Sequence, residues 1–470
     1  MSPRLTKIVC TLGPSSQNLA QIQALAESGM NVARINLSHG SAEEHARTVK
    51  ILKEINSKRS VPIGILFDTK GADIRTGDVE EPIPVKKDSE VVFSSSVTCV
   101  PNGRTMIYVD HDGFADDVKE TDTILIDNGE LSFDILSIDK DGSVLAKARE
   151  DGEIGSRRHV NLPGADLDMP SITKKDWEDI AFAVEQDADF LALSFIRNSD
   201  EVNEVRKFLN QRKSSMQIIT KVETAQAIEN IAEIVDASDG IMIARGDLGA
   251  EVPYEKLPAL QIEIIVRCSD AGKPVIVATH MLESMKEHAI PTRAEMTDVA
   301  NAAMERTDAT MLSGETASGK HPNKAIEAMD KLLVSTESNS ARFVRSKDFT
   351  ISDDNEAKME SVVSMADSTK VTSIIAFTQT GRTARLISKF RPDVPVIACT
   401  EDAKAQKQMT LMYGVSPLLV EFSEDPEVTI QNGIKIAKET GLLKDKDTVV
   451  LVSDVQTQEE NVWSVQTRTL

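Results

Sequence analysis

Two stretches of the chain decide the fold: Ile-Ile-Thr-Lys-Val-Glu-Thr at residues 218–224 and Gly-Ile-Met-Ile-Ala-Arg-Gly-Asp-Leu-Gly at residues 240–249. Each begins as a short apolar, β-rich run and ends in charged side chains, and helical periodicity separates the two, as in a parallel β–α–β unit. Side chains two positions apart along a strand point the same way, so Lys221 and Glu223 can face one pocket. Asp247 can enter that pocket from the next strand. The pattern therefore predicts a cation and two carboxylates at neighbouring strand ends.

Runs of this kind occur eight times between residues 7 and 311, separated by helical periodicity or by one large insertion. Alternating strands and helices in that number predict an α/β fold, a parallel (β/α)8 or TIM barrel, whose chemistry collects at the carboxyl ends of the strands. The polar motifs of this chain fall at those ends. The expected strands are residues 7–11, 32–36, 63–67, 190–193, 217–220, 240–243, 275–278 and 309–311.

The rest of the chain predicts two further domains. Residues 71–167 contain alternating runs and hairpin turns such as Ile-Asp-Asn-Gly-Glu-Leu, which indicate an inserted, β-barrel-like domain that can close over substrate as a lid. Beyond residue 340, three new apolar runs alternate with helical stretches. We therefore assign residues 1–70 and 168–340 to a catalytic barrel, 71–167 to the inserted lid domain and 341–470 to a C-terminal α/β domain.

The composition narrows the expected partners and location. In 470 residues, 75 Asp and Glu against 53 Lys and Arg give a formal net charge of −22, which repels nucleic-acid backbones and makes nucleic acid an unlikely partner. A small phosphorylated substrate stays possible, because local cations and a metal ion dominate the field inside a cleft. The cysteines, Cys10, Cys99, Cys268 and Cys399, have neither disulfide-framework nor zinc spacing. Without an apolar membrane-spanning run or a signal-peptide core, we expect a cytoplasmic protein with no membrane partner.

Polar side chains interrupt the second predicted strand. Arg34, Asn36 and Ser38 alternate with apolar residues, whereas a buried parallel strand should be apolar throughout. A solvated edge strand is the alternative interpretation. The planar guanidinium of Arg34 suits a phosphate. Asp68 and Thr69, which would form an ordinary turn if read alone, end the next strand and complete a set of oxygen donors for a hard cation.

The charged ends of the fifth and sixth runs indicate phosphoryl chemistry. Glu223 and Asp247 are hard oxygen ligands that suit Mg²⁺ or Mn²⁺ completed by water and substrate oxygens. They could instead be a general acid and base, or helix caps. Lys221 beside them favours the metal interpretation, because it can stabilise a phosphoryl group in flight.

Two further strand ends offer groups for an anionic substrate. Residues 245–249 form a glycine-containing turn expected to lead into a helix, and backbone N–H groups such as that of Gly246 can bind a carboxylate or phosphate there. Thr279 ends the seventh run with a hydroxyl that can reach a substrate oxygen, although a threonine in this position is more often a helix N-cap.

With these motifs the sequence resembles the pyruvate kinases along nearly its full length. The segments that carry the resemblance are Lys-Ile-Val-Cys-Thr-Leu-Gly-Pro, Asn-Val-Ala-Arg-Ile-Asn-Leu-Ser-His-Gly, Asp-Thr-Lys-Gly-Ala-Asp-Ile-Arg-Thr-Gly, Val-Asn-Leu-Pro-Gly, Ile-Thr-Lys-Val-Glu, Ala-Arg-Gly-Asp-Leu-Gly, Pro-Thr-Arg-Ala-Glu and Met-Leu-Ser-Gly-Glu-Thr-Ala. The resemblance implies a glycolytic phosphotransferase that transfers the phosphoryl group of phosphoenolpyruvate to ADP, giving pyruvate and ATP. It also implies a homotetramer with a C-terminal effector domain.

The resemblance assigns roles to individual residues. Arg34 would contact the phosphoryl group, Lys221 would steady it in transit, and Glu223 with Asp247 would hold magnesium. Gly246, Asp247 and Thr279 would bind the substrate, with Thr279 near the site of enolate protonation. The implied potassium ligands are Asn36, Ser38, Asp68 and the carbonyl of Thr69, and the implied nucleotide-binding residues are Asn36, Leu37, Ser38, His39, Arg75 and Arg158.

Several positions depart from the family pattern. Gly-Ala-Asp at residues 71–73 stands where Gly-Pro-Glu is usual and keeps the acid associated with potassium dependence. Arg-Arg-His at residues 157–159 replaces Lys-Lys-Gly, so Arg158 becomes the expected lid cation and a glycine is lost. His280 stands in place of glutamine and Ile290 in place of arginine.

The C-terminal domain contains a segment similar to the family's effector-phosphate loop, with a bare strand-to-helix turn as the alternative interpretation. Its residues are Thr378, Gln379, Thr380, Gly381, Arg382 and Thr383. Residues 453–460 lack the glycine-rich loop that commonly covers a sugar bisphosphate. The existence and identity of an effector therefore stay open.

Two other functions remain as alternatives. A related barrel could handle phosphoenolpyruvate or pyruvate with magnesium while making or breaking carbon–carbon bonds, against which Arg34, Lys221 and the insertion argue. A non-catalytic metabolite sensor could have kept the fold. The intact set of Lys221, Glu223 and Asp247 favours an enzyme over that sensor.

Overall fold

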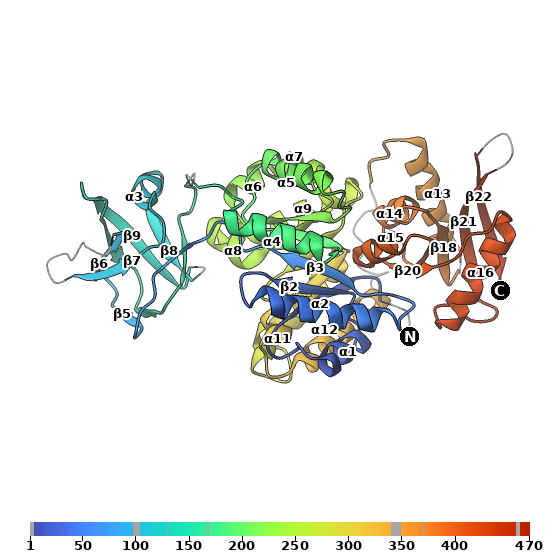
Figure 1. Ribbon diagram of the computed structural model, residues 1–470, viewed down its shortest axis with the longest axis horizontal. Coiled ribbons are helices and arrows are strands. Elements are labelled where there is room, and N and C mark those ends of the chain that lie inside the picture. Colours follow the sequence, from blue (N-terminus) through green and yellow to red (C-terminus); the bar gives the residue numbers. More distant parts are fainter. Residues whose placement is uncertain are drawn as a thin grey trace.

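The computed structural model describes residues 4–96, 104–127, 129–165, 167, 169–339, 349–369, 371–456 and 461–470. A parallel barrel lies at the centre of the elongated molecule, with a β domain at one end and an α/β domain at the other (Figure 1). The predicted fold class is confirmed. None of the described helices combines the length and the apolar character needed to cross a membrane.

The eight predicted runs form a closed barrel with the strand order β1-β17-β16-β15-β14-β13-β3-β2. Each predicted boundary lies within two residues of the observed one. The strands are β1 (Lys7–Leu12), β2 (Val32–Asn36), β3 (Gly64–Asp68), β13 (Phe190–Leu193), β14 (Gln217–Val222), β15 (Gly240–Ala244), β16 (Val275–Ala278) and β17 (Ala309–Leu312).

Helices surround the barrel, and their apolar faces pack against the outward-facing strand residues in one large core. The longer helices are α1 (Leu19–Glu27), α2 (Ala42–Asn56), α4 (Lys174–Glu185), α5 (Ser199–Gln211), α7 (Ile231–Ala237), α9 (Leu257–Asp270), α10 (Arg293–Met304) and α12 (Pro322–Asn339). Shorter segments follow the strand ends: α6 (Ala225–Glu229), α8 (Arg245–Glu251), η2 (Tyr254–Lys256), η3 (Glu283–Lys286) and α11 (Gly314–Ala317).

The interior of the barrel is apolar at one level and charged at the next. Val32, Leu66 and Ile219 belong to an inner apolar cluster. Two residues further along their strands stand Arg34, Asp68 and Lys221, which point the same way because side chains alternate along a strand. The carboxyl ends of the strands therefore present charged groups above a packed apolar floor.

The inserted domain is a mixed, mainly antiparallel sheet in which only the β6–β7 pair of the described strands is parallel, with an aromatic core of Phe93, Phe114 and Phe133. Its strand order is β4-β12-β8-β9-β10-β6-β7, and a bridge between Thr76 and Val109 links the two outer strands, as expected for a barrel-like sheet. The elements are β4 (Ile74–Arg75), β5 (Ile83–Val85), β6 (Glu90–Ser94), β7 (Thr105–Tyr108), α3 (Phe114–Asp117), η1 (Val118–Glu120), β8 (Thr123–Ile126), β9 (Leu131–Ile138), β10 (Val144–Ala148), β11 (Gly152–Ile154) and β12 (His159–Asn161).

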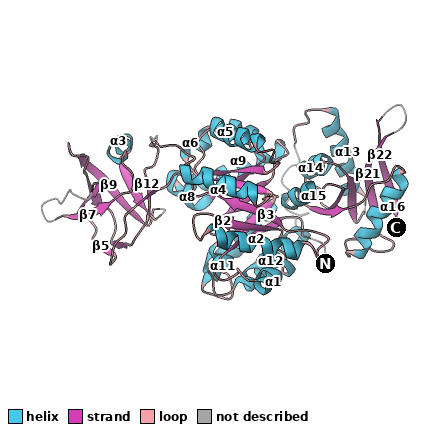
Figure 2. Ribbon diagram, viewed as in Figure 1, coloured by secondary structure: helices cyan, strands magenta, loops and turns pink. Residues whose placement is uncertain are grey.

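The C-terminal domain is a five-stranded sheet flanked by helices, in the order β20-β19-β18-β21-β22 (Figure 2). The three predicted runs form β18, β19 and β21, whereas β20 and β22, the two edge strands, were not predicted. The elements are α13 (Asp354–Ser368), β18 (Ser373–Phe377), α14 (Arg382–Lys389), β19 (Val396–Thr400), α15 (Ala403–Gln408), η5 (Met409–Leu411), β20 (Val415–Leu419), α16 (Pro426–Glu439), β21 (Thr448–Gln456) and β22 (Asn461–Thr469).

Candidate active site

Lys221 lies at the centre of the charged layer, buried at the carboxyl end of β14. Its Nζ atom is 2.7 Å from Glu223 Oε1 and 3.3 Å from Asp68 Oδ1, and it donates a 2.7 Å hydrogen bond to Ser194 Oγ. Burial lowers the pKa of Lys221, but the Asp68 and Glu223 carboxylates outweigh that effect and leave the pKa above its ordinary value. The side chain is therefore a fixed cation.

Arg34 faces Lys221 across a shared carboxylate. Its Nε atom donates a 2.6 Å hydrogen bond to Asp68 Oδ2, and Nη1 donates at 2.9 Å to the hydroxyl of Thr11. Burial raises the pKa of Asp68, but the two cations outweigh that effect and hold the pKa below its usual range. Strands β2, β3 and β14 thus bring the predicted Arg34, Asp68 and Lys221 together as one network.

Glu223 is completely buried just beyond β14, where its Oε2 atom accepts a 2.7 Å hydrogen bond from the backbone N–H of Phe195. Burial, aided by the negative charge of Asp247 and opposed by Lys221, raises the pKa of Glu223 to about 7. Two carboxylates placed so that their charges oppose each other favour a divalent cation, which relieves that repulsion.

The donor set fits magnesium or manganese. Within the described ranges, no three His, Cys, Asp or Glu side chains gather into a metal site. Glu223 and Asp247 would therefore supply two oxygen ligands and leave the other positions to water and substrate, an arrangement that Mg²⁺ commonly adopts.

The four predicted potassium ligands lie at adjacent strand ends. Asn36 and Asp68 are register partners of β2 and β3, and the Asp68 carbonyl accepts a 2.9 Å bond from the N–H of Leu37. The Asn36 side chain accepts a 3.1 Å bond from the N–H of Ser38, and the Thr69 carbonyl accepts a 2.7 Å bond from Ser194 Oγ. These residues therefore stand at neighbouring strand ends, and their role as potassium ligands stays a prediction.

Gly246 and Thr279 are directly bonded, because the Gly246 N–H donates to Thr279 Oγ1 at 2.7 Å. The Thr279 hydroxyl in turn donates to the Ala278 carbonyl at 2.7 Å. Thr279 and His280 both have positive φ angles, 66° and 55°, a conformation that is costly for residues with a Cβ atom and often occurs at functional sites.

The prediction for residues 245–249 needs a correction. These residues are not a turn before a helix, since α8 begins at Arg245 itself and contains all of them. Strand β15 ends at Ala244, which is also the N-cap residue of α8. No residue is therefore left between the strand and the helix to form a turn.

Arg245 supports this corner of the site, although the sequence assigned it no role. Its guanidinium forms two 2.7 Å bonds with the Asp298 carboxylate and donates to the carbonyl of Thr279 at 2.7 Å. The interaction fixes the strained strand end next to Gly246. An arginine directly before Gly-Asp at a strand end was the only sequence signal for it.

The predicted nucleotide residues divide into two groups. A cavity of about 580 Å³ lies beside the charged network and is lined by Arg34, Asn36 and His39, together with Gly13, Pro14 and Ser313 at the ends of neighbouring strands. The other group belongs to the inserted domain. There Arg75 pairs with Asp73 at 2.5 Å and Arg158 pairs with Asp127 at 3.1 Å, so neither contacts that cavity.

Comparison with known proteins identifies the family. The model "Pyruvate kinase, barrel domain" matches residues 3–326, and "Pyruvate kinase, alpha/beta domain" matches residues 356–465. This chain belongs to the pyruvate kinase family. Pyruvate kinases are phosphotransferases that convert phosphoenolpyruvate and ADP to pyruvate and ATP, so the predicted enzyme class and reaction are confirmed.

Curated pyruvate kinases align along nearly the whole chain. Pyruvate kinase isozyme G, chloroplastic, from Nicotiana tabacum is 42% identical over 466 residues, which cover 98% of this chain and 82% of the relative. The pyruvate kinase of Lactobacillus delbrueckii subsp. bulgaricus is 41% identical over 458 residues, covering 96% and 78%. That of Bacillus licheniformis is 39% identical over 458 residues with the same coverage.

The segment that resembles the pyruvate kinase effector loop joins β18 to α14. Gly381 caps α14 with a positive φ of 82°, and the Arg382 guanidinium lies 4.0 Å from Asp353 Oδ2. Thr378 is buried at the end of β18. Residues 457–460 of the final segment lie outside the described residues, so the glycine-poor loop has no structural account here.

Proposed function

We propose that the network of Arg34, Asp68, Lys221 and Glu223 is the phosphoryl-transfer centre of this chain. The observation that carries the proposal is the Lys221 ammonium group, buried and held charged within 3.3 Å of two carboxylates. A preorganised cation in a dry site stabilises a migrating PO₃ group strongly, because no solvent has to reorganise during the transfer.

The proposal includes the substrate-binding roles that the resemblance implies. Arg34 binds the phosphoryl group through the guanidinium edge that remains beside the cavity, and Lys221 neutralises the group as it moves. The carboxylate of phosphoenolpyruvate meets Gly246 and Asp247 at the start of α8. The hydroxyl of Thr279 lies close to the carbon of the enolate that takes up a proton.

The cofactors of the proposal are Mg²⁺ or Mn²⁺ on Glu223 and Asp247, and K⁺ on Asn36, Ser38, Asp68 and the Thr69 carbonyl. When bound, the divalent ion supplies a Lewis acid that withdraws charge from the phosphoryl and enolate oxygens. Glu223 is kept in place for this task by the Phe195 N–H. Asp73 holds Lys70 and Arg75 at 2.9 and 2.5 Å and so organises the hinge beside the cation sites.

In the proposal, ADP and ATP occupy the cavity lined by Arg34, Asn36 and His39. Leu37 and Ser38 lie between Asn36 and His39 in the chain. Arg75 and Arg158 reach the nucleotide phosphates only when the inserted domain moves toward the barrel. The pairing of Arg158 with Asp127 is compatible with such a motion, since that ion pair is partly exposed and pairs of this type are weak. The pairing of Arg75 is firmer, because the Asp73 side chain is only 3% exposed.

The remaining parts of the proposal rest on the family. We propose a cytoplasmic homotetramer that acts in glycolysis, with the domains at residues 1–70 and 168–340, 71–167 and 341–470. The loop of Thr378 to Thr383 is proposed as an effector-phosphate site. Gel filtration with light scattering tests the tetramer, and phosphate-ester titration of a Thr380→Ala, Arg382→Ala variant tests the loop.

A coupled assay for pyruvate tests the main proposal. Phosphoenolpyruvate and ADP should give pyruvate, and the activity should disappear without a divalent metal and fall without potassium. A sensor would form no pyruvate under any condition. A carbon–carbon lyase or synthase would act on phosphoenolpyruvate or pyruvate without requiring ADP, and either result would reject phosphoryl transfer.

A further inference from the structure

Strand β12 of the inserted domain lies against helix α8 of the barrel, the helix that carries Asp247. Asn161 Nδ2 donates a 3.0 Å hydrogen bond to Glu251 Oε1, and His159 Nδ1 lies 3.7 Å from Asp247 Oδ1. The spacing explains why both contacts form. Residues 159 and 161 are two apart on a strand, residues 247 and 251 are four apart on a helix, and each pair therefore shares one face with a separation of about 6 to 7 Å.

Both contacts are shielded from solvent. Asn161 is 4% exposed and the His159 side chain 13% exposed, and the imidazole packs against Phe195 with 5.7 Å between ring centroids. Phe195 is also the residue whose N–H holds Glu223. Strand β12 thus touches the surroundings of both proposed metal carboxylates.

Glu251 belongs to neither the charged network nor the nucleotide cavity. It is partly buried, and burial raises its pKa to about 7, while the Asn161 bond opposes that rise. Asn161 is therefore the side chain that stabilises Glu251 in its position. A hydrogen bond between desolvated groups is costly to break, since the remaining partner loses its water as well.

We propose that β12 and α8 form a two-point docking contact through which the inserted domain sets the position of Asp247. Asn161 with Glu251, and His159 beside Asp247, are positioning residues for the divalent metal in this account, which rests on the proposed metal role of Asp247. His159 occupies a position where the family pattern has glycine, so this chain has a side chain at the contact that a glycine lacks.

Titration of the substrate-free protein with Mn²⁺, followed by electron paramagnetic resonance, tests the docking contact. Asn161→Ala changes no charge and should weaken Mn²⁺ binding about two- to tenfold, the range that corresponds to one typical hydrogen bond. Glu251→Ala should have a similar effect. The double variant should bind no more weakly than the worse single variant, because both remove the same interaction.

Matched variants separate this contact from simple charge and folding effects. Glu251→Gln removes the charge but keeps an acceptor, so it should bind Mn²⁺ nearly as the wild type does. Glu150→Ala removes a comparable pair inside the inserted domain, where Ser132 donates to Glu150 at 2.9 and 3.0 Å, and should leave Mn²⁺ binding unchanged. If Asn161→Ala fails to fold by circular dichroism, the two Glu251 variants carry the same test.

Two results would overturn the docking contact: Mn²⁺ binding by folded Asn161→Ala that equals the wild type, or equal weakening by Glu251→Gln and Glu251→Ala. Pyruvate formation by the wild type tests the proposed function separately. A wild type that forms no pyruvate rejects that function, whereas the Mn²⁺ titrations still decide whether β12 positions α8.

Discussion

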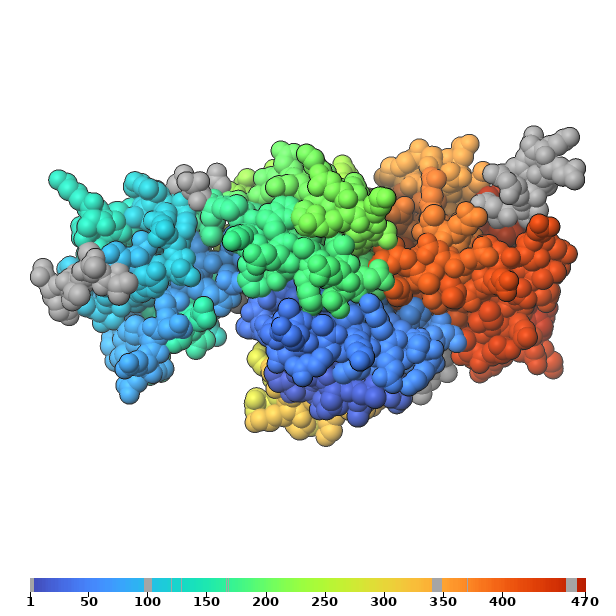
Figure 3. Space-filling view, viewed as in Figure 1, coloured from blue at the N-terminus to red at the C-terminus, as the bar shows by residue number. Residues whose placement is uncertain are grey.

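The barrel meets its two attached domains through junctions of different strength. In the space-filling view, an open notch separates part of the inserted domain from the barrel, whereas the C-terminal domain abuts the barrel without such a notch (Figure 3). At the inserted domain the side-chain contacts include the hydrogen bond from Asn161 to Glu251, the longer approach of His159 to Asp247 and the ion pair between Lys70 and Asp73. We expect this junction to open at a lower cost than the C-terminal one.

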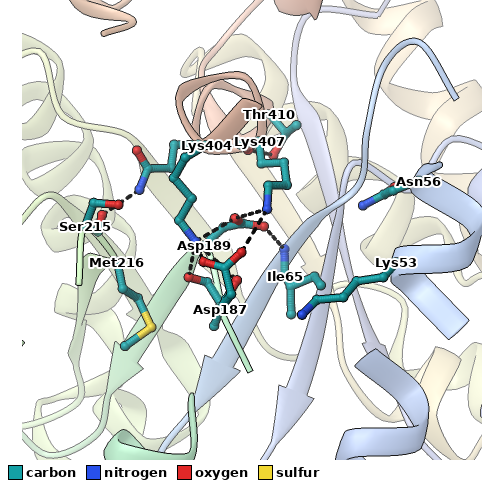
Figure 4. Close-up of polar contacts among 12 residues, drawn as sticks. Lys53, Asn56, Ile65, Asp187, Asp189, Ser215, Met216, Lys404, Lys407 and Thr410 are labelled. Atoms are coloured by element: carbon teal, nitrogen blue, oxygen red, sulfur yellow. Dashed lines mark hydrogen bonds and ion pairs between the residues drawn. The ribbon is translucent and has the colours of Figure 1, made fainter. Parts of the chain in front are cut away.

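The C-terminal junction contains several ion pairs, some partly exposed and some buried. Lys404 and Lys407 of α15 point at Asp187 and Asp189 beneath the barrel (Figure 4). Lys404 Nζ lies 2.9 Å from Asp187 Oδ1 and 3.1 Å from Asp189 Oδ1, and Asp189 is fully buried. The Oδ2 atom of Asp189 accepts a 3.0 Å hydrogen bond from the N–H of Ile65 in β3. The lysines therefore bind a carboxylate that is itself bonded to a barrel strand.

A second ion pair reinforces that junction. Arg391 donates to both oxygens of Asp308 at 2.7 and 2.6 Å, and both side chains are nearly inaccessible to solvent. Breaking a buried pair by removing one partner is strongly destabilising, whereas a neutral hydrogen bond contributes far less. From this comparison we expect the C-terminal domain to unfold together with the barrel and the inserted domain to separate from the barrel more easily.

The largest effect is expected from Arg391→Met, which leaves the Asp308 carboxylate buried without its ion-pair partner. The free energy of unfolding should fall by about 3 to 5 kcal/mol. Urea denaturation followed by circular dichroism measures it. A loss below about 1 kcal/mol would show that the two junctions do not differ in the way described.

Between the junctions, Lys221→Met should affect both chemistry and stability, because it also leaves Glu223 and Asp68 without one buried cation. Turnover should drop by at least about two orders of magnitude, because one preorganised charge-stabilising group is lost. Steady-state kinetics and the melting temperature are measured on the same sample. Retained turnover in the folded variant would reject the role of Lys221.

The double substitution Lys404→Ala, Lys407→Ala probes the partly exposed pair of Figure 4. Asp189 would keep its bond from Ile65 but lose both cations, so we expect a loss of about 1 to 3 kcal/mol, less than for Arg391→Met. Arg149→Ala, which breaks an exposed pair with Asp134, is the control and should cost almost nothing. Equal losses in the two variants would remove the distinction between buried and exposed pairs.

The smallest effect on global stability is expected from Asn161→Ala at the inserted-domain junction. A loss of about 0.5 to 1.5 kcal/mol corresponds to one neutral hydrogen bond. Hydrogen exchange should detect faster opening of β12 with little change in the barrel strands. A loss as large as that of Arg391→Met would make the inserted domain as firmly attached as the C-terminal one.

Much of the barrel could be predicted from the sequence because a buried parallel strand is a short, continuous apolar run. The same rule indicated the site, because charged residues such as Arg34 and Lys221 are unusual in buried apolar strands and therefore suggest a function. Strand β20 escaped prediction because its segment, Val-Ser-Pro-Leu-Leu, has a proline, which only an edge strand tolerates.

The supporting contacts could not be predicted, because they join residues far apart in the chain. Ser194 bridges Lys221 and the Thr69 carbonyl, yet in the sequence it is only a serine after an apolar run. The partner of Arg245, Asp298, is 53 residues away. The docking of β12 on α8 depends on the relative placement of two domains, for which no local pattern exists. The roles of the individual site residues stay predictions.

The C-terminal domain covers the end of the barrel at which strand β3 begins. Leu411 of η5 belongs to the same inner cluster as Val32, Leu66 and Ile219. A Cβ atom at Gly64 would lie 2.5 Å from Thr410 Oγ1, so only glycine lets this segment approach the start of β3. Hybrid enzymes that exchange C-terminal domains between relatives will therefore need to exchange the segment of Thr410 and Leu411 together with Gly64 of the barrel. Each part fits only when the other is present.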